Sequence, residues 1–467
     1  MAPIMKIISS FAKTVFVPLF NIFGMFPLCF YIVKKVSNNE KFEFEYNKIL
    51  YCSLFSLGFF AYSYLTIIIG FLFKQVIKGY KTEDGNVSEY ANNGFQFFLL
   101  TMGLTYYLCT YQKDFVVELV KDHLTLLLVL DVLGVLFSIY ICYVGHDFEP
   151  KNTDSENEVM LKKFYKEERK REDKEGGLFE YHFLFRFYRG MRYNTSILGV
   201  DVKQLTNCRF GCGLWLVLLW FYYTYSVEIK AQGNYVLLFV NIIQTLYLGK
   251  FYWLEYGYFS TLDIILDRVG YYINYGCISF VPTLYTLNSY NLAHNLVTTD
   301  PHMLYFLFGL SLLFLILNYY MDYQKLCFQL YRKDVLDKAD PSKFGTILQT
   351  ITKYGSVFYI KSKEGWTWIE EERDGVRSKL LLTGLWGFIK KPNYLFELLL
   401  TFTYAFMGLF LSNYNLVHCY SFSYFTFLFF LLIHRCYRDN SKCSSKYGNL
   451  WKVYSEEVPS FIIYGVF

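Results

Sequence analysis

The sequence predicts an all-α polytopic membrane protein with about ten transmembrane helices. Of its 467 residues, 54% are hydrophobic and only 18% are charged, against about 25% charged in typical soluble domains. The apolar residues are gathered into runs long enough to cross about 30 Å of hydrocarbon. Because a backbone in lipid must satisfy its own hydrogen bonds, we expect these runs to be helices.

Ten apolar runs are candidate spans, and the last two are short or strongly tilted. The first is too long for the core of a cleavable signal peptide and lacks a small-residue cleavage site, so we expect it to remain as a span. The runs cover residues 15–33, 49–73, 95–111, 124–144, 213–227, 235–254, 269–290, 304–321, 396–411 and 420–433.

Charge asymmetry predicts the orientation of the spans. Residues 145–212 and 322–379 follow even-numbered spans and carry clusters of Lys and Arg, whereas residues 291–303 have neither. The positive-inside rule therefore favours both termini in the cytosol, although Lys34 and Lys35 oppose it.

Three regions follow from this pattern. Residues 1–144 are N-terminal transmembrane helices, residues 145–212 a charged cytosolic linker, and residues 213–467 a transmembrane core. Within the linker, residues 151–177 are highly charged and lack apolar periodicity, which favours a solvated spacer. Residues 341–379 contain the alternating segments SVFYIKSK and GWTWIEEE, which predict a short hairpin.

Charge and cysteine content exclude other classes of site. A net charge of +5 suits loops beside an anionic leaflet better than a nucleic-acid surface. The 11 cysteines lack the paired spacing and nearby His of a zinc site, so we expect reduced thiols and no metal. The sequence has no P-loop, and no GxGxxG follows a predicted strand.

After residue 433, charged residues appear at helical spacing. Arg435, Asp439, Cys443 and Tyr447 recur every four residues, so they share one face of a helix. Cations alone would suffice to anchor a helix that leaves the bilayer. An acid, a thiol and a phenol in register with the arginine favour a binding site, and the anchoring interpretation stays open.

The same region resembles a known family. LLLTGLWGFIKKPNYLFELLL and HRCYRDNSKCSSKYGNLWKVYSEEVPSFIIYGVF are similar to the closing region of the membrane-bound sterol reductases. Upstream, NCRFG, KFYWLEYGYFSTLDIILDRVGYYINYGCISFVPTLYT and DYQKLCF are most similar to the delta-7 branch of that family. The resemblance covers about residues 180–467. It implies an NADPH-dependent enzyme of the endoplasmic reticulum that reduces a sterol double bond, with a sterol, the bilayer and other sterol-pathway enzymes as partners.

The resemblance also implies an NADPH pocket. A nicotinamide dinucleotide outside a Rossmann fold needs cations for its phosphates, an aromatic surface for a ring and donors for its ribose. The matching positions here are Lys325, Trp386, Asn393, Tyr394, Arg435, Arg438, Asp439, Cys443 and Tyr447. Taken alone, Trp386 is also typical of a membrane-interface residue.

Three positions of that pocket depart from the family pattern. Gln329 stands where the family has Arg, Leu385-Trp386 replaces a Trp pair, and Lys390-Lys391 replaces Arg-His. Gln329 and Lys390 complete the expected cofactor-binding set. Lysine keeps the charge but lacks the planar fork that binds phosphate in a bidentate way.

A second group of candidates lies in residues 253–285. Glu255, Asp263 and Asp267 sit in or beside apolar sequence, where ionised groups are costly and usually functional. Asp263 and Asp267 are four apart and predict one helix face. Two interpretations are open. Either the aspartates pair with Arg268 at a helix end, or one of them is an acid at the end of a sterol cavity that keeps its proton because it is desolvated.

The reduction needs such an acid. An isolated carbon–carbon double bond accepts hydride only after protonation, which for a 5,7-diene occurs at carbon 8 before hydride reaches carbon 7. The site must therefore combine a proton donor with a dry cavity. The family pattern DIAHDR reads DIILDR here, with Leu266 in place of His. We expect Asp267 to donate, supported by Glu255, with Asp263 and Tyr285 as further candidates.

Three alternatives stay open at this point. The enzyme could reduce a sterol at carbon 14 or carbon 24, because specificity depends on cavity shape. The closing pattern also resembles isoprenylcysteine carboxyl methyltransferases, which use S-adenosylmethionine. Finally, the departures at Gln329 and Leu266 suit a non-catalytic sterol-binding or scaffold protein that keeps the fold.

Overall fold

The computed structural model describes residues 15–37, 45–82, 84–145, 156–175, 183–230, 234–295, 297, 300–332, 346–373, 376–412 and 414–466. The chain divides into two units. The first comprises Met1–Thr298 with Leu411–Ser421, and the second comprises Thr299–Phe410 with Phe422–Phe467.

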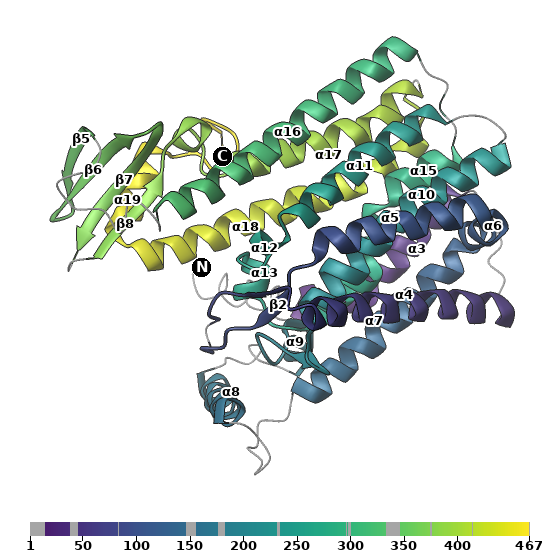
Figure 1. The fold of residues 1–467 in the computed structure, drawn as a ribbon, viewed down its shortest axis with the longest axis horizontal. Helices are drawn as coiled ribbons and strands as arrows, with labels where there is room; N and C mark the ends of the chain where they lie inside the picture. Colours follow the sequence, from purple (N-terminus) through teal and green to yellow (C-terminus); the bar gives the residue numbers. More distant parts are fainter. Residues whose placement is uncertain are drawn as a thin grey trace. The chain divides into compact units, whose positions relative to one another are not determined.

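The first unit is built from helices with two small β-ribbons (Figure 1). Its elements are α2 (Val17–Leu19), the π-helical η2 (Phe20–Gly24), α3 (Met25–Val36), α4 (Tyr46–Leu72), β1 (Val76–Lys78), β2 (Glu89–Ala91), α5 (Gly94–Tyr111), α6 (Lys113–Lys121), α7 (His123–Gly145), α8 (Glu156–Glu175), α9 (Phe183–Arg189), β3 (Ser196–Ile197), β4 (Val200–Asp201), the π-helical η3 (Gln204–Gly211), α10 (Cys212–Lys230), α11 (Tyr235–Trp253), α12 (Glu255–Tyr258), α13 (Leu262–Ile265), α14 (Tyr271–Tyr275), the π-helical η4 (Gly276–Tyr285) and α15 (Leu287–His294).

The second unit combines three long helices with a sheet (Figure 1). Its elements are α16 (Pro301–Tyr331), β5 (Thr346–Lys353), β6 (Ser356–Lys363), β7 (Trp366–Arg373), β8 (Val376–Leu381), the 3₁₀ turn η7 (Gly384–Gly387), α17 (Pro392–Leu411), α18 (Ser423–Tyr447) and α19 (Asn449–Glu457). The 3₁₀ turn η8 (Leu416–Phe422) leads into α18.

Eight helical stretches of the described chain are long and apolar enough to cross a membrane, which confirms the predicted class. They are Val17–Val36, Tyr46–Leu72, His123–Gly145, Gln204–Ile229, Tyr235–Trp253, Pro301–Tyr331, Pro392–Leu411 and Leu416–Tyr447. Predicted spans 95–111 and 269–290 are not among them.

The ends of α4 and α7 nevertheless indicate that α5 crosses between them. Phe71, near the C-terminal end of α4, and Val144, near the C-terminal end of α7, line the same cavity. The two helices therefore end on the same side, and the chain must run back to the other side after α4 so that α7 can begin there. α5 has 18 residues and a length of about 27 Å. Tyr62 of α4 lies 3.0 Å from the Thr101 hydroxyl of α5, which places the two helices side by side.

Residues 271–294, which form α14, η4 and α15, run antiparallel to α7. At one end, the Tyr290 ring lies 4.5 Å from the ring of His123, the first residue of α7. At the other end, Val269 packs in a buried cluster with Ile141. Pro282 lies inside the π-helical part, where its missing N–H removes one backbone hydrogen bond. The segment therefore follows α7 along most of its length.

The charged run is not a solvated spacer where the structure describes it. Residues 156–175 form the helix α8, whose Tyr165 is 3% exposed and packs against Met191 and Tyr193. The Tyr165 hydroxyl donates a hydrogen bond to Asp84 and accepts one of 2.9 Å from the Tyr193 backbone N–H. A few aromatic and aliphatic side chains on one face are enough to dock a helix that is otherwise charged.

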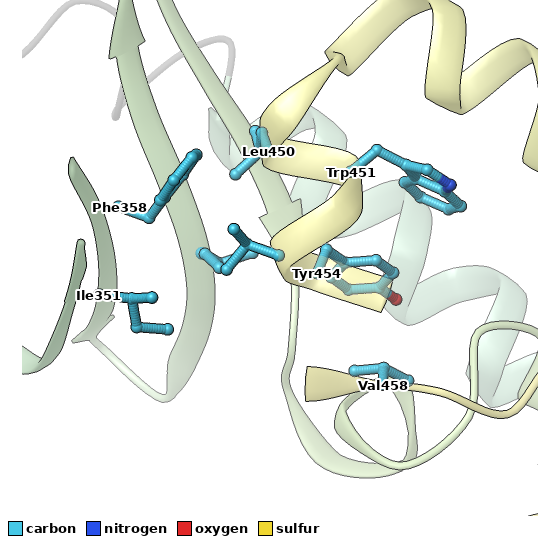
Figure 2. Packing of buried hydrophobic residues seen from close by; sticks show 8 residues of the cluster. Ile351, Phe358, Leu450, Trp451, Tyr454 and Val458 are labelled. Atoms are coloured by element: carbon cyan, nitrogen blue, oxygen red, sulfur yellow. The ribbon is translucent and has the colours of Figure 1, made fainter. Parts of the chain in front are cut away.

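The predicted hairpin is larger than expected, because it is a four-stranded antiparallel sheet in the order β5-β6-β7-β8. Its first turn pairs Lys353 with Ser356 around Tyr354 and Gly355, both at positive φ, as a type I′ hairpin requires. One face packs against α19, where buried apolar residues of both elements interlock (Figure 2). The cluster comprises Ile351, Phe358, Ile369, Leu450, Trp451, Val453, Tyr454 and Val458.

Candidate cofactor and acid sites

A buried ion pair lies at the centre of the predicted cofactor site in the second unit. Lys391, the residue before α17, donates through Nζ to Oδ2 of Asp439 on α18. Their side chains are 9% and 20% exposed. Burial acts to lower the pKa of Lys391, but the charge of Asp439 outweighs it and raises that pKa above its ordinary value. Lys391 is therefore a permanent cation at neutral pH.

The structure contains the central part of the helix face that the sequence predicts for α18. The Cys443 Sγ lies 3.9 Å from Oδ2 of Asp439, one helical turn away. Tyr447 is half-buried and packs against the cluster between the sheet and α19. Arg435 and Arg438 are half-buried on the same helix.

α16 and η7 bring a second cation and an indole to this site. Lys325 is half-buried, and its Nζ lies 5.4 Å from the centre of the Trp386 ring. The charges of Lys391 and Asp439 both act on Lys325, so the three groups form one electrostatic cluster. Trp386 is 3% exposed and belongs to a buried cluster with Met321, Phe328 and other apolar residues. It is therefore enclosed within the unit.

The start of α17 contributes Asn393 and Tyr394. Asn393 donates through Nδ2 to Oδ1 of Asp322 at 3.0 Å, and its carbonyl accepts from Asn318 at 2.8 Å. Lys391 lies 5.7 Å from the centre of the Tyr394 ring. These contacts fix both side chains beside the ion pair.

Two polar atoms at this site are buried without a hydrogen-bond partner in the described part of the chain: the Trp386 Nε1 and the Asn393 Oδ1. A buried donor or acceptor left unpaired costs about 1–3 kcal/mol, so a bound group that paired with these atoms would recover that cost. One donor and one acceptor beside Lys325, Lys391 and an aromatic surface fit a nicotinamide dinucleotide.

Two other predicted cofactor residues point elsewhere. The Nζ of Lys390 lies 3.4 Å from the Pro459 carbonyl and 4.4 Å from the centre of the Phe461 ring. Gln329 is exposed on α16, one turn beyond Lys325. The sequence predicts Lys390 as the cofactor-binding lysine, but Lys391 is the one that pairs with Asp439. Its sequence signals are the Lys390-Lys391 pair, which stands where the family has Arg-His, and its position directly before Pro392, the first residue of α17.

In the first unit, Glu255 is held in a buried ion pair. Arg209 donates from both terminal nitrogens to the Glu255 carboxylate, and one of them also donates to Oδ1 of Asn93 at 2.9 Å. Arg209 is 0% exposed and Glu255 is 1% exposed. Gly94 packs directly against this carboxylate, where any side chain would collide with it. The pair joins η3, α12 and the start of α5.

Asp263 and Asp267 do not share a helix face as predicted. α13 is a single turn that ends at Ile265, so Asp267 lies beyond it. The Lys203 Nζ donates to the Ile264 carbonyl at 2.8 Å and to the Asp267 carbonyl at 2.5 Å. Both aspartates are half-buried, and their charges act on Lys203.

The neighbours of these acids have defined partners. Arg268 pairs with Glu168 of α8 at 2.5 Å and lies 5.1 Å from the centre of the Tyr193 ring. Tyr285 ends η4, half-buried, with its ring edge-on to Trp215 at 5.2 Å. Tyr285 and Asp267 thus lie on different elements.

The buried Lys203 gives a pH prediction. Burial lowers its pKa to about 8, although Asp201 and Asp267 oppose the shift. In the unfolded chain a lysine keeps its proton to about pH 10.4. Between these values the unfolded state binds more protons, so stability should rise with pH, by at most about 1.4 kcal/mol per pH unit. Denaturation of the detergent-solubilised protein at pH 7.5 and pH 9.5 measures this. Lys203→Met should lose that increment, and an identical slope in both proteins would contradict the assignment.

Comparison with known proteins identifies the family of this chain. Residues 4–467 match the family described as "Ergosterol biosynthesis ERG4/ERG24 family". The chain is 28% identical over 394 residues to 7-dehydrocholesterol reductase of Arabidopsis thaliana, which covers 84% of this chain and 80% of that protein. It is 29% identical over 293 residues to 7-dehydrocholesterol reductase of Xenopus laevis, covering 61% and 55%. With Delta(14)-sterol reductase of Dictyostelium discoideum it shares 26% over 285 residues, covering 61% and 55%. This multi-pass membrane protein therefore belongs to the ERG4/ERG24 family of sterol reductases.

Proposed function

We propose that this enzyme reduces the delta-7 double bond of a sterol, in the manner of 7-dehydrocholesterol to cholesterol, with NADPH as the reductant. The relatives named for that reaction match the larger part of the chain. The observation that carries the proposal is the cluster of Lys325, Lys391 and Asp439 beside Trp386, with the Trp386 Nε1 unpaired.

The residues of the second unit would act as a binding and positioning set. Lys325 supplies charge for a phosphate, and Trp386 and Asn393 supply a donor and an acceptor for the sugar or amide. Lys391 and Asp439 hold α17 and α18 together at this point. The cofactor, when bound, supplies the hydride. Arg435, Arg438, Cys443 and Tyr447 remain proposed contacts on α18.

The proton is proposed to come from Asp267, with Asp263 and Tyr285 as the alternatives. Glu255 suits this task poorly, because both of its carboxylate oxygens already accept hydrogen bonds from Arg209. Glu255 would instead support the acid indirectly, by fixing the position of the segment that leads to Asp267. Placement in the endoplasmic reticulum with both termini in the cytosol, and association with other sterol-pathway enzymes, belong to the same proposal.

Incubation of membranes that contain the protein with 7-dehydrocholesterol and NADPH tests this function. We expect mass spectrometry to detect the product in which the bond between carbons 7 and 8 is saturated. We expect little product from a delta-14 or a C-24 unsaturated sterol. Asp267→Asn should lower turnover by about 100-fold or more, the usual contribution of a general acid, without weakening NADPH binding. Asp263→Asn, four residues away, is the matched control.

Each other outcome changes the assignment in a specific way. Product from the delta-14 sterol alone would favour the activity named for the Dictyostelium relative. Loss of turnover in Asp263→Asn alone would exchange the roles of the two aspartates. No product from any of the three sterols would contradict an enzymatic role and favour the sterol-binding alternative.

A further inference from the structure

We propose that the first unit binds a phosphoethanolamine group, the headgroup of a zwitterionic membrane phospholipid, in a polar cavity lined by none of the candidate cofactor and acid residues. The cavity has a volume of about 630 Å³, within the ~300–1,000 Å³ typical of small-molecule sites. Its lining comes from the ends of α4 and α7, the loop between β1 and β2, α8, and residues 192–201.

The cavity lies where two spanning helices end. Phe71 and Val144, which line it, are each the last residue but one of a spanning helix. Two spans that end together mark the level where hydrocarbon gives way to headgroups. Ile69 and Leu72 near the end of α4 are 47% and 74% exposed, which leaves an apolar surface next to the cavity. A lipid can therefore keep its acyl chains against α4 while its headgroup enters the cavity.

The lining carries both signs of charge. Lys162 and Arg192 supply two cations, while Asp84, Glu89 and Asp201 supply three carboxylates. Lys162 and Asp201 are only 4% and 5% exposed, so these two charges belong to the cavity wall, whereas Glu89 lies at its exposed rim. A simple anion would be repelled by the carboxylates, and a simple cation would be repelled by Lys162 and Arg192. A phosphate joined to an ammonium presents a charge of opposite sign to each set.

The lining also favours a primary ammonium over the trimethylammonium of choline. Quaternary ammonium groups are recognised by cages of several aromatic faces. Here the aromatic lining residues are Phe71 and Tyr165, and Arg192 already lies over the Tyr165 ring at 5.7 Å. A primary ammonium brings three N–H donors. The Asn194 Oδ1, which is buried without a partner in the described chain, is an acceptor for one of them.

Native mass spectrometry of the full chain, released from nanodiscs with equal phosphatidylethanolamine and phosphatidylcholine, tests the proposal. We expect one retained phosphatidylethanolamine, favoured about tenfold over phosphatidylcholine. Glu89→Gln and Lys162→Gln should each lower its retention about tenfold, as expected for one lost charge-assisted contact. Lys163→Gln and Glu167→Gln are matched controls on α8, because both side chains are exposed and outside the lining.

The outcomes separate the possible ligands. Equal retention of both lipids, or retention unchanged in Glu89→Gln, would overturn the proposal. Glu89 is exposed, so this variant keeps the test valid even if loss of the buried Lys162 impairs folding. Soluble glycerophosphoethanolamine should displace the retained lipid. If it binds while no phosphatidylethanolamine is retained, the ligand is a soluble phosphoethanolamine compound and a bilayer lipid is excluded.

Discussion

Replacement of Glu255 by glutamine is expected to destabilise the protein by about 3–5 kcal/mol, because the change leaves the guanidinium of Arg209 buried without a counter-charge. Glutamine preserves one acceptor oxygen and the size of the side chain, so the loss comes from the missing charge. The damage should spread beyond one helix, because the pair also holds Asn93 at the start of α5.

Thermal denaturation of the detergent-solubilised variant measures this loss without a substrate. Glu228→Gln is the matched control, since Glu228 pairs with Lys113 at 2.6 Å but is 36% exposed. An exposed pair contributes about 0–1 kcal/mol, so the control should melt close to the wild type. A Glu255→Gln protein of normal stability but without turnover would contradict the structural role and restore Glu255 as an acid catalyst.

The second large effect is expected at Lys391 and Asp439. Either Lys391→Met or Asp439→Leu leaves one charge buried and unpaired, at a cost of about 3 kcal/mol or more. The double variant leaves neither charge, so it should be clearly more stable than the sum of the single changes predicts. Denaturation of all four proteins gives the coupling energy. Additive losses would show that the pair is not formed.

The double variant also separates stability from cofactor binding. Because it restores folding but removes both groups from the cluster around Lys325, its affinity for NADPH should fall at least about tenfold. Fluorescence titration with NADPH provides the readout. Lys452→Met on α19 is the control, because that lysine is exposed and lies over Tyr354, outside the proposed pocket. Wild-type NADPH affinity in the double variant would argue against the proposed pocket.

Hydropathy and spacing predicted the parts of this fold that depend on local sequence. Helical spacing placed Asp439 and Cys443 one turn apart, as the structure has them. Local sequence could not choose between Lys390 and Lys391. The choice depends on Asp439, which lies 48 residues away from Lys391.

Tertiary contacts also explain the other differences. Glu255 looked like a candidate acid because its partner Arg209 is 46 residues distant. The helix face predicted for Asp263 and Asp267 is absent because Lys203, from η3's N-terminal end, binds the carbonyls that follow the single turn of α13. Local sequence predicts a spacer at α8, because its docking partners, Met191 and Tyr193, lie beyond a further helix.

The modest hydropathy of α5 has a consequence for biosynthesis. Gln96 and three tyrosines make this helix a poor substrate for insertion by itself, although it returns the chain across the bilayer. Its hydroxyl and amide groups find partners on α4, such as Thr101 with Tyr62 and Asn93 with the Thr66 carbonyl. The translocon would therefore release α4 and α5 into lipid as one hairpin. Polar substitutions on α4 should then trap α5 on the wrong side of the membrane during synthesis, before any question of catalysis arises.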